Sequence, residues 1–161
     1  MVAKRRFLSK KEVKQLLEAI EAKLGLTDLP REGYEEVEDE DAKLILLNRE
    51  PFLVILEDGL ALPHLKYLLK HGHCFLPKIV VDKGAVKPIG SGADVMAPGI
   101  VRIDGSFREN DIAVVTEERM IPIAVVKAIY PSEAVASMKK GKVALNLHYP
   151  GDKFWKLSEK L

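Results

Sequence analysis

The sequence predicts an α+β protein with two domains, a small α+β domain over residues 1–76 and a β pseudo-barrel over residues 77–161. An amphipathic helix pattern comes early in the chain, whereas the second half consists mostly of short apolar stretches between turn residues. About six such stretches in about 75 residues would leave loose sheet edges unless the sheet closes on itself. The 161 residues suffice for two small domains, and the 47% apolar content is that of an ordinary globular protein.

Residues 9–24 carry the clearest helix pattern. Ser9 and Glu12 stand three positions apart before an apolar run, as in a capping box, in which each side chain bonds the other residue's backbone amide. Gly25 is placed to end the helix. The apolar positions follow at helical spacing and predict one buried face: Val13, Leu16, Leu17, Ile20 and Leu24.

The rest of the first domain alternates turns with short apolar stretches. An acidic run at residues 35–41 is interpreted as a solvated edge strand or loop that would repel RNA; a metal site or a docking strip for a basic partner is the alternative. Turn residues then separate three predicted strands and a helix that Gly72 ends, at residues 43–48, 52–56, 60–62 and 63–70.

Extended segments of the second domain are expected at residues 79–81, 85–89, 100–104, 111–116, 122–129 and 142–149. The stretch 122–129 is nearly continuous in apolar residues, so we expect a central strand that is covered on both faces. Ser132 is expected to cap a short helix that ends near Lys140.

Charge divides unevenly between the two halves. Residues 1–77 hold 12 Lys and Arg against 14 Asp and Glu, a net of −2, and residues 78–161 hold 13 against 10, a net of +3. A mildly basic second half is compatible with a nucleic-acid surface whose recognition depends on shape as well as charge. The single cysteine, the lack of a signal-peptide pattern and the lack of a long apolar run favour a cytoplasmic protein, and abundant Glu and Lys favour a thermophile.

The candidate binding stretch is residues 77–99, where three glycines and two lysines fall within ten positions. Glycine lets a backbone approach another molecule closely, and amides beside Lys83 and Lys87 would suit a phosphate or a ribose. Glycines between strands can also serve only to make turns. Because the spacing matches neither phosphate-loop nor dinucleotide patterns, no nucleotide cofactor is expected.

Two further kinds of site are considered and set aside. His64, His71, His73 and Cys74 lie close in sequence, but a histidine pair at a helix end and a buried thiol are favoured over a metal site. The cysteine has no evident base partner and the carboxylates gather in one acidic run, so the chain is not expected to be an enzyme.

Several motifs resemble known proteins. Lys83-Gly84-Ala85, Ser91-Gly92-Ala93-Asp94 and Met96-Ala97-Pro98-Gly99 resemble the start of a PUA domain, a small RNA-binding pseudo-barrel. From residue 62 onward the chain resembles the malignant T-cell-amplified-sequence family, in an archaeal form, and this resemblance implies a pre-PUA domain packed on a PUA domain. The additional matching motifs are Leu62-Pro63-His64-Leu65, Phe75-Leu76-Pro77, Asn146-x-His148-Tyr149, Gly151-Asp152 and Trp155.

The resemblance implies a non-catalytic RNA-binding protein of translation initiation, reinitiation or recycling, which binds the acceptor end of tRNA, small-subunit ribosomal RNA, or both. Family members usually act beside a density-regulated factor; because the chain ends soon after Trp155, that partner is expected to be a separate molecule. One alternative is an RNA-targeting subunit or accessory factor of tRNA or rRNA modification, of the pseudouridine or archaeosine type. Another is a protein-interaction scaffold without affinity for RNA.

By position, the resemblance also implies an RNA-binding surface in which glycines admit the RNA backbone, lysines neutralise phosphates and Ser91 or a backbone group recognises a 2′-hydroxyl. Met96 and Pro98 are expected to pack beneath this surface, and Trp155 to seal the barrel. The predicted RNA-binding residues are Lys83, Gly84, Ala85, Lys87, Gly90, Ser91, Gly92, Ala93, Asp94 and Lys142.

Overall fold

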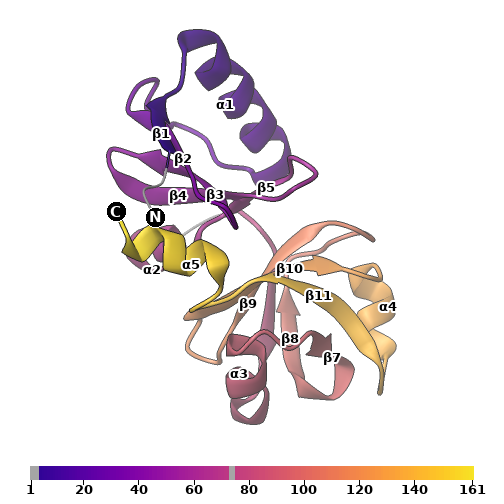
Figure 1. Cartoon of the computed structure of the whole chain (residues 1–161). Coiled ribbons are helices and arrows are strands. Elements are labelled where there is room, and N and C mark those ends of the chain that lie inside the picture. The colour runs from indigo at the N-terminus through magenta and orange to yellow at the C-terminus, as the bar shows by residue number, and fades with distance from the viewer. Residues whose placement is uncertain (1–3, 73–74) are drawn as a thin grey trace. The chain divides into compact units, whose positions relative to one another are not determined.

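The computed structural model describes residues 4–72 and 75–161, which fold into two compact units (Figure 1). The first unit comprises the described residues up to Phe75 together with residues 153–161, and the second runs from Leu76 to Asp152. The units therefore differ from the predicted domains at the C-terminus, which the sequence had assigned to the second domain. No helix in the described part of the chain is long and apolar enough to cross a membrane.

The first unit is a five-stranded antiparallel sheet whose strands follow chain order. The strands are β1 (Lys4–Phe7), β2 (Tyr34–Glu38), β3 (Lys43–Leu47), β4 (Glu50–Ile55) and β5 (Ala61–Pro63), and the helices are α1 (Lys10–Leu24), α2 (Leu65–His71) and α5 (Lys153–Glu159). Apolar side chains from these elements are fully buried between helices and sheet, among them Ile20, Leu44, Phe52, Leu65 and Leu157.

Helix α1 has the ends that the sequence predicts. The Ser9 hydroxyl accepts a hydrogen bond from the Glu12 amide at 3.1 Å, and the Glu12 carboxylate accepts one from the Ser9 amide at 2.9 Å, which confirms the capping box. Gly25 ends the helix with φ +64°. Helix α2 starts later than predicted, because Pro63 completes β5 and His64 becomes the cap, its Nδ1 accepting from the Lys66 amide at 3.0 Å. Gly72 ends α2 as expected.

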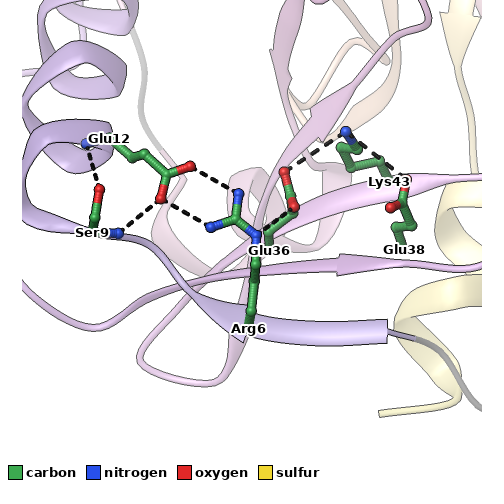
Figure 2. A network of polar contacts seen from close by, with 6 residues as sticks. All are labelled: Arg6, Ser9, Glu12, Glu36, Glu38 and Lys43. Atoms are coloured by element: carbon green, nitrogen blue, oxygen red, sulfur yellow. Dashed lines mark hydrogen bonds and ion pairs between the residues drawn. The ribbon is translucent and has the colours of Figure 1, made fainter.

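Strand β1 was not predicted, and it changes the environment of the acidic run. Pairing with β1 makes β2 an inner strand, so the expectation of a solvated edge strand is wrong. Glu35 is buried and forms an ion pair with Arg5. Figure 2 shows Arg6 between Glu12 and Glu36, with Arg6 Nη2–Glu12 Oε2 at 2.8 Å and Arg6 Nε–Glu36 Oε2 at 3.0 Å. Ion pairing with the basic strand β1 allows an acidic strand such as β2 to lie within the sheet.

The second unit is a six-stranded sheet in the order β7-β11-β10-β9-β6-β8, antiparallel except for the β6–β9 pair. All six strands contribute to one apolar core, so the sheet wraps around that core as the predicted pseudo-barrel does. The strands are β6 (Lys78–Val81), β7 (Val95–Met96), β8 (Ile100–Asp104), β9 (Ile112–Thr116), β10 (Pro122–Ala128) and β11 (Lys142–His148); a 3₁₀ turn η1 (Ala97–Gly99) and helix α4 (Ser132–Ser137) connect some of them.

The predictions of a central strand covered on both faces hold for β10, whereas those for Ser132 and Trp155 are wrong. Strand β10 lies between β9 and β11 and its consecutive residues 124–126 are all buried, which confirms a strand covered on both faces. The Ser132 hydroxyl does not cap α4, which begins after Pro131. Instead, Ser132 Oγ accepts from the Phe107 amide at 3.1 Å and donates to the Phe107 carbonyl at 3.2 Å. Trp155 does not seal the barrel, since it belongs to the first unit and its ring stacks on His64 with centroids 6.2 Å apart.

The predicted extended segment at residues 85–89 is helical. Helix α3 (Lys83–Gly90) starts at Asp82, whose carboxylate accepts from the Ala85 amide at 3.0 Å. The sequence misled here because Gly84 and Pro88 are both poor residues for a helix interior. A short helix tolerates them once its first turn is capped and Ile89 is buried in the core.

The pH dependence of stability tests the network in Figure 2. Hydrogen bonds from Arg6 are the largest influence on Glu12 and lower its pKa from 4.5 to about 2. A folded-state pKa below the unfolded value gives stability that is present above pH 4.5 and is lost as the pH falls towards 2. Glu12→Gln keeps an oxygen for the capping box but loses the charge, so its urea midpoint at pH 7 should be lower than that of wild type. The difference between the two midpoints should nearly vanish by pH 2.

The matched control is Glu18→Gln, on the same helix, where the structure gives the carboxylate no cation partner among the described residues. Its urea midpoint should follow wild type at every pH. A Glu12→Gln gap that is as large at pH 2 as at pH 7 would contradict a role for the ion pair with Arg6.

Candidate functional site

A groove of about 360 Å³ opens on the second unit at the glycine-rich stretch that the sequence singled out. Helix α3 forms one wall, and the turn after it, β7 and η1 form the other. The lining is mainly apolar with a carboxylate near each end: Asp82, Gly84, Ala85, Pro88, Ile89, Ala93, Asp94, Met96, Pro98 and Gly99.

Glycine is required where the groove walls meet. A Cβ on Gly99 would lie 2.9 Å from the Ala85 Cβ, closer than packed carbon atoms come. The Gly99 carbonyl accepts a hydrogen bond from the Asp82 amide at 2.9 Å, which holds η1 against the start of α3. Gly99 therefore lets the two walls pack closely together at this point.

The turn after α3 has a second glycine requirement. Gly92 has φ +109°, and an added Cβ would lie 2.9 Å from the Tyr149 ring. The turn is closed by backbone hydrogen bonds from Gly92 to Ile89 at 3.0 Å and from Ala93 to Pro88 at 3.0 Å. Gly90, by contrast, has open space where a Cβ would stand.

Asn146 on β11 fixes this turn to the barrel. Its side-chain amide donates to the carbonyls of Ile89 and Ala93, both at 2.9 Å. Its backbone amide donates to Asp94 Oδ1 at 2.7 Å, and Lys142 Nζ lies 2.9 Å from Asp94 Oδ2. Burial raises the pKa of Asp94, but the Asn146 amide and the Lys142 ammonium outweigh burial and hold that pKa below its ordinary value.

The predicted RNA-binding residues divide into three groups. Lys83, Gly84, Lys87, Ser91 and Ala93 are exposed on α3 and its following turn, whereas Ala85, Gly90, Gly92 and Asp94 are half-buried. The two exposed lysines stand one helical turn apart and have no carboxylate partner among the described residues. Lys142 joins the same region, but its charge is already paired with Asp94.

Some residues of the groove were missed or misplaced by sequence reasoning. Met96 and Pro98 were expected to pack beneath the loop, and this is wrong: both are exposed on the groove wall, Met96 to 48%. Asp82, Asn146 and Tyr149 position the site and were not assigned to it. Asp82 carried a signal as a capping residue three positions before Ala85, and Asn146 and Tyr149 stood in one of the motifs that carry the family resemblance.

The histidines of the first unit do not form a metal site with other described residues. His73 and Cys74 lie outside the described residues, and over 4–72 and 75–161 no three His, Cys, Asp or Glu side chains come together to hold an ion. His64 caps α2 and stacks on Trp155, and the His71 ring lies 4.5 Å from that of Tyr67.

Comparison with known families matches the two parts of the chain separately. The model of the PUA domain matches residues 77–150, and that of a domain of unknown function, DUF1947, matches residues 4–71. A PUA-domain crystal structure from Aeropyrum pernix superposes with a TM-score of 0.87 at 27% identity, covering 98% of this chain and 91% of that one.

Relatives are found in archaea and eukaryotes. An uncharacterised Methanocaldococcus jannaschii protein is 40% identical, and the match covers 96% of each chain. Translation machinery-associated protein 20 of Schizosaccharomyces pombe is 31% identical over 70% of this chain and 65% of its own length. Malignant T-cell-amplified sequence 1-B of Xenopus laevis is 28% identical over 72% of this chain and 66% of its own length.

Substitution of two neighbouring glycines separates their roles. Gly92→Ala should cost about 1–3 kcal/mol, because alanine is strained at this φ and its Cβ would collide with Tyr149. Gly90→Ala is the matched control: it meets no neighbouring atom and should be neutral or stabilise helix α3 by up to about 1 kcal/mol.

Urea denaturation followed by circular dichroism measures both effects. Equal stability of Gly92→Ala and wild type would contradict the constrained turn, and a loss in Gly90→Ala as large as that in Gly92→Ala would show that any added methyl group disturbs the segment.

Proposed function

This chain belongs to the family of PUA-domain proteins with an N-terminal DUF1947 domain, whose relatives include the malignant T-cell-amplified-sequence and translation machinery-associated 20 proteins, and we propose from this that its second unit binds the single-stranded acceptor end of tRNA. A PUA domain and translation-associated relatives support an RNA-binding role in translation. The proposal adds the tRNA end, contact with the small ribosomal subunit, and action by binding without catalysis.

The observation that carries this proposal is the groove beside Lys83 and Lys87, two exposed lysines with no ion-pair partner among the described residues. Lys83 and Lys87 are exposed along α3, where they would meet successive phosphates. The apolar walls at Pro88, Met96 and Pro98 would contact the faces of unstacked bases, and exposed backbone groups and Ser91 would bond a 2′-hydroxyl. The groove volume of about 360 Å³ lies at the lower end of the range of about 300–1,000 Å³ for small-ligand sites. A groove of this size suits a single nucleotide.

Single-stranded RNA suits this groove better than a duplex does. Sequence-specific proteins usually recognise RNA where bases are splayed out of the helix, since the deep major groove of the duplex is closed to side chains. The groove offers only a few contacts and the second half of the chain is only mildly basic, with a net of +3 over residues 78–161. Such a surface fits a short, flexible end rather than a long charged helix.

We further propose that the chain acts in the cytoplasm beside a separate protein of the density-regulated type. The support is kinship with translation-associated eukaryotic proteins, of which this chain matches about two thirds of the length. Placing an acceptor end on the small subunit would serve initiation or recycling, where tRNA is loaded or removed.

Titration of tRNA against the protein tests the acceptor-end proposal. Wild type should bind intact tRNA more tightly than tRNA lacking its single-stranded 3′ end, and binding should weaken with salt. Lys83→Ala and Lys87→Ala should each cost about 1–3 kcal/mol in binding free energy, and each should reduce the salt slope by roughly 0.7 if the phosphate is single-stranded.

Lys11→Ala is the matched control, because Lys11 is likewise an exposed lysine in the first turn of a helix and belongs to the other unit. Its affinity for tRNA should equal that of wild type. If removing the 3′ end and replacing either α3 lysine leave affinity unchanged, the acceptor-end proposal is wrong.

A further inference from the structure

A second groove lies in the first unit, along helix α1. Two adjoining cavities of about 660 and 320 Å³ share Lys14, Leu17 and Arg31 and therefore form one continuous depression, the α1 groove. Helix α1 is one wall, and the segment of residues 26–32, which leads from α1 to β2, is the other. This segment runs back along the helix, since residues 26–29 lie opposite the end of α1 and residues 31–32 lie opposite its beginning.

The second wall of the α1 groove is held in place by buried contacts. Gly25 turns the chain with φ +64°, and Leu26 inserts its side chain into the core, where it is 6% exposed. The Tyr34 hydroxyl donates to the Pro30 carbonyl at 2.8 Å, and Tyr34 itself is 1% exposed. A loop anchored at both ends in this way keeps the groove open without a ligand, which lowers the cost of binding.

Apolar side chains line the α1 groove between charged ones, and its two ends carry opposite charge. Leu17 is common to both cavities, and Val13, Leu26 and Leu29 extend the apolar surface to either side. The end near the start of α1 is lined by Lys10, Lys14 and Arg31 with one carboxylate, Glu32. The end near the helix C-terminus is lined by three carboxylates, those of Glu18, Glu21 and Asp28.

The charged side chains of the α1 groove have no ion-pair partner among the described residues. Arg5, Arg6, Lys43, Lys70 and Lys160 of the same unit each form an ion pair. No such pair involves Lys10, Lys14 or Arg31, nor the three carboxylates at the other end, among the described residues. Other cations of this unit, Lys11 and Lys23 among them, also lack an ion pair among the described residues, so the distinctive feature is the separation of opposite charges along one groove.

We propose that the α1 groove docks an amphipathic peptide segment of a protein partner, with acidic residues at one end and basic residues at the other. Apolar side chains of the segment would lie on Leu17 and its neighbours, as in helix-in-groove recognition. Its acidic end would face Lys10, Lys14 and Arg31. RNA fits poorly, because the three carboxylates would repel phosphates along half of the groove. The proposal concerns the first unit and does not depend on the tRNA proposal.

The test uses the full chain and three fluorescein-labelled peptides of about 15 residues, long enough for one amphipathic helix. The first peptide has leucines at helical spacing with glutamates in one half and lysines in the other. The second has the same composition with the charges interleaved, so that reversing its direction cannot restore the match. The third replaces the glutamates of the first with lysines. Fluorescence anisotropy measures affinity, and a single-stranded RNA serves as a fourth probe.

We expect the segregated peptide to bind at least tenfold more tightly than the interleaved one. The double variant Lys10→Glu, Lys14→Glu should bind the segregated peptide at least tenfold more weakly than wild type does. It should bind the all-lysine peptide more tightly. Lys11→Glu is the matched control, since Lys11 stands on α1 outside the groove lining, and it should bind as wild type does. Circular dichroism confirms that each variant is folded.

Three outcomes would overturn the proposal: equal affinity for the segregated and interleaved peptides, no measurable binding of either at millimolar concentration, or an equal loss in Lys11→Glu. Loss of RNA binding in the double variant, with the peptides unaffected, would show instead that the groove contacts nucleic acid.

Discussion

The site in the second unit depends on the hydrogen bonds that Asn146 makes to the turn after α3. One side chain on β11 holds the carbonyls of Ile89 and Ala93, while its backbone amide holds the Asp94 carboxylate. The turn therefore takes its shape from the neighbouring strand β11, and its own glycines only make that shape possible. Three hydrogen bonds from one residue fix the turn at three points, Ile89, Ala93 and Asp94.

Charge pairing distinguishes surfaces that stabilise the protein from surfaces that remain available for binding. In the first unit the basic strand β1 neutralises the acidic strand β2, and this pairing allows Glu35 to be buried. Exposed ion pairs of this kind contribute little stability each, but they remove charge from the surface. Lys83 and Lys87 on α3, and the charges of the α1 groove, are among those without an ion pair in the described part of the chain. Their positions in two different units fit two different kinds of partner.

The sequence was most informative where local signals and burial agree. The capping box of α1, the central strand β10 and the pseudo-barrel were all predictable, because periodicity, capping residues and core packing favour the same structure there. Helix α3 was not, since Gly84 and Pro88 oppose helix locally and only the capped first turn and the burial of Ile89 compensate. Strand β1 and the position of Trp155 depend on partners distant in sequence, which no local pattern reveals.

The ten predicted RNA-binding residues lie on α3, the turn after it and the start of β11, and the contacts that hold this segment in shape could not be predicted from the sequence. Lys142 illustrates this, because a lysine near a proposed phosphate site looks like a phosphate ligand, yet its ammonium pairs with Asp94 at 2.9 Å. Its more direct role is to keep Asp94 ionised, since together with the Asn146 amide it outweighs the burial that would raise the pKa of Asp94. An ionised Asp94 in turn accepts the Asn146 amide and completes the turn. Asp94 therefore holds the turn that lines the groove, and its own charge is paired with Lys142.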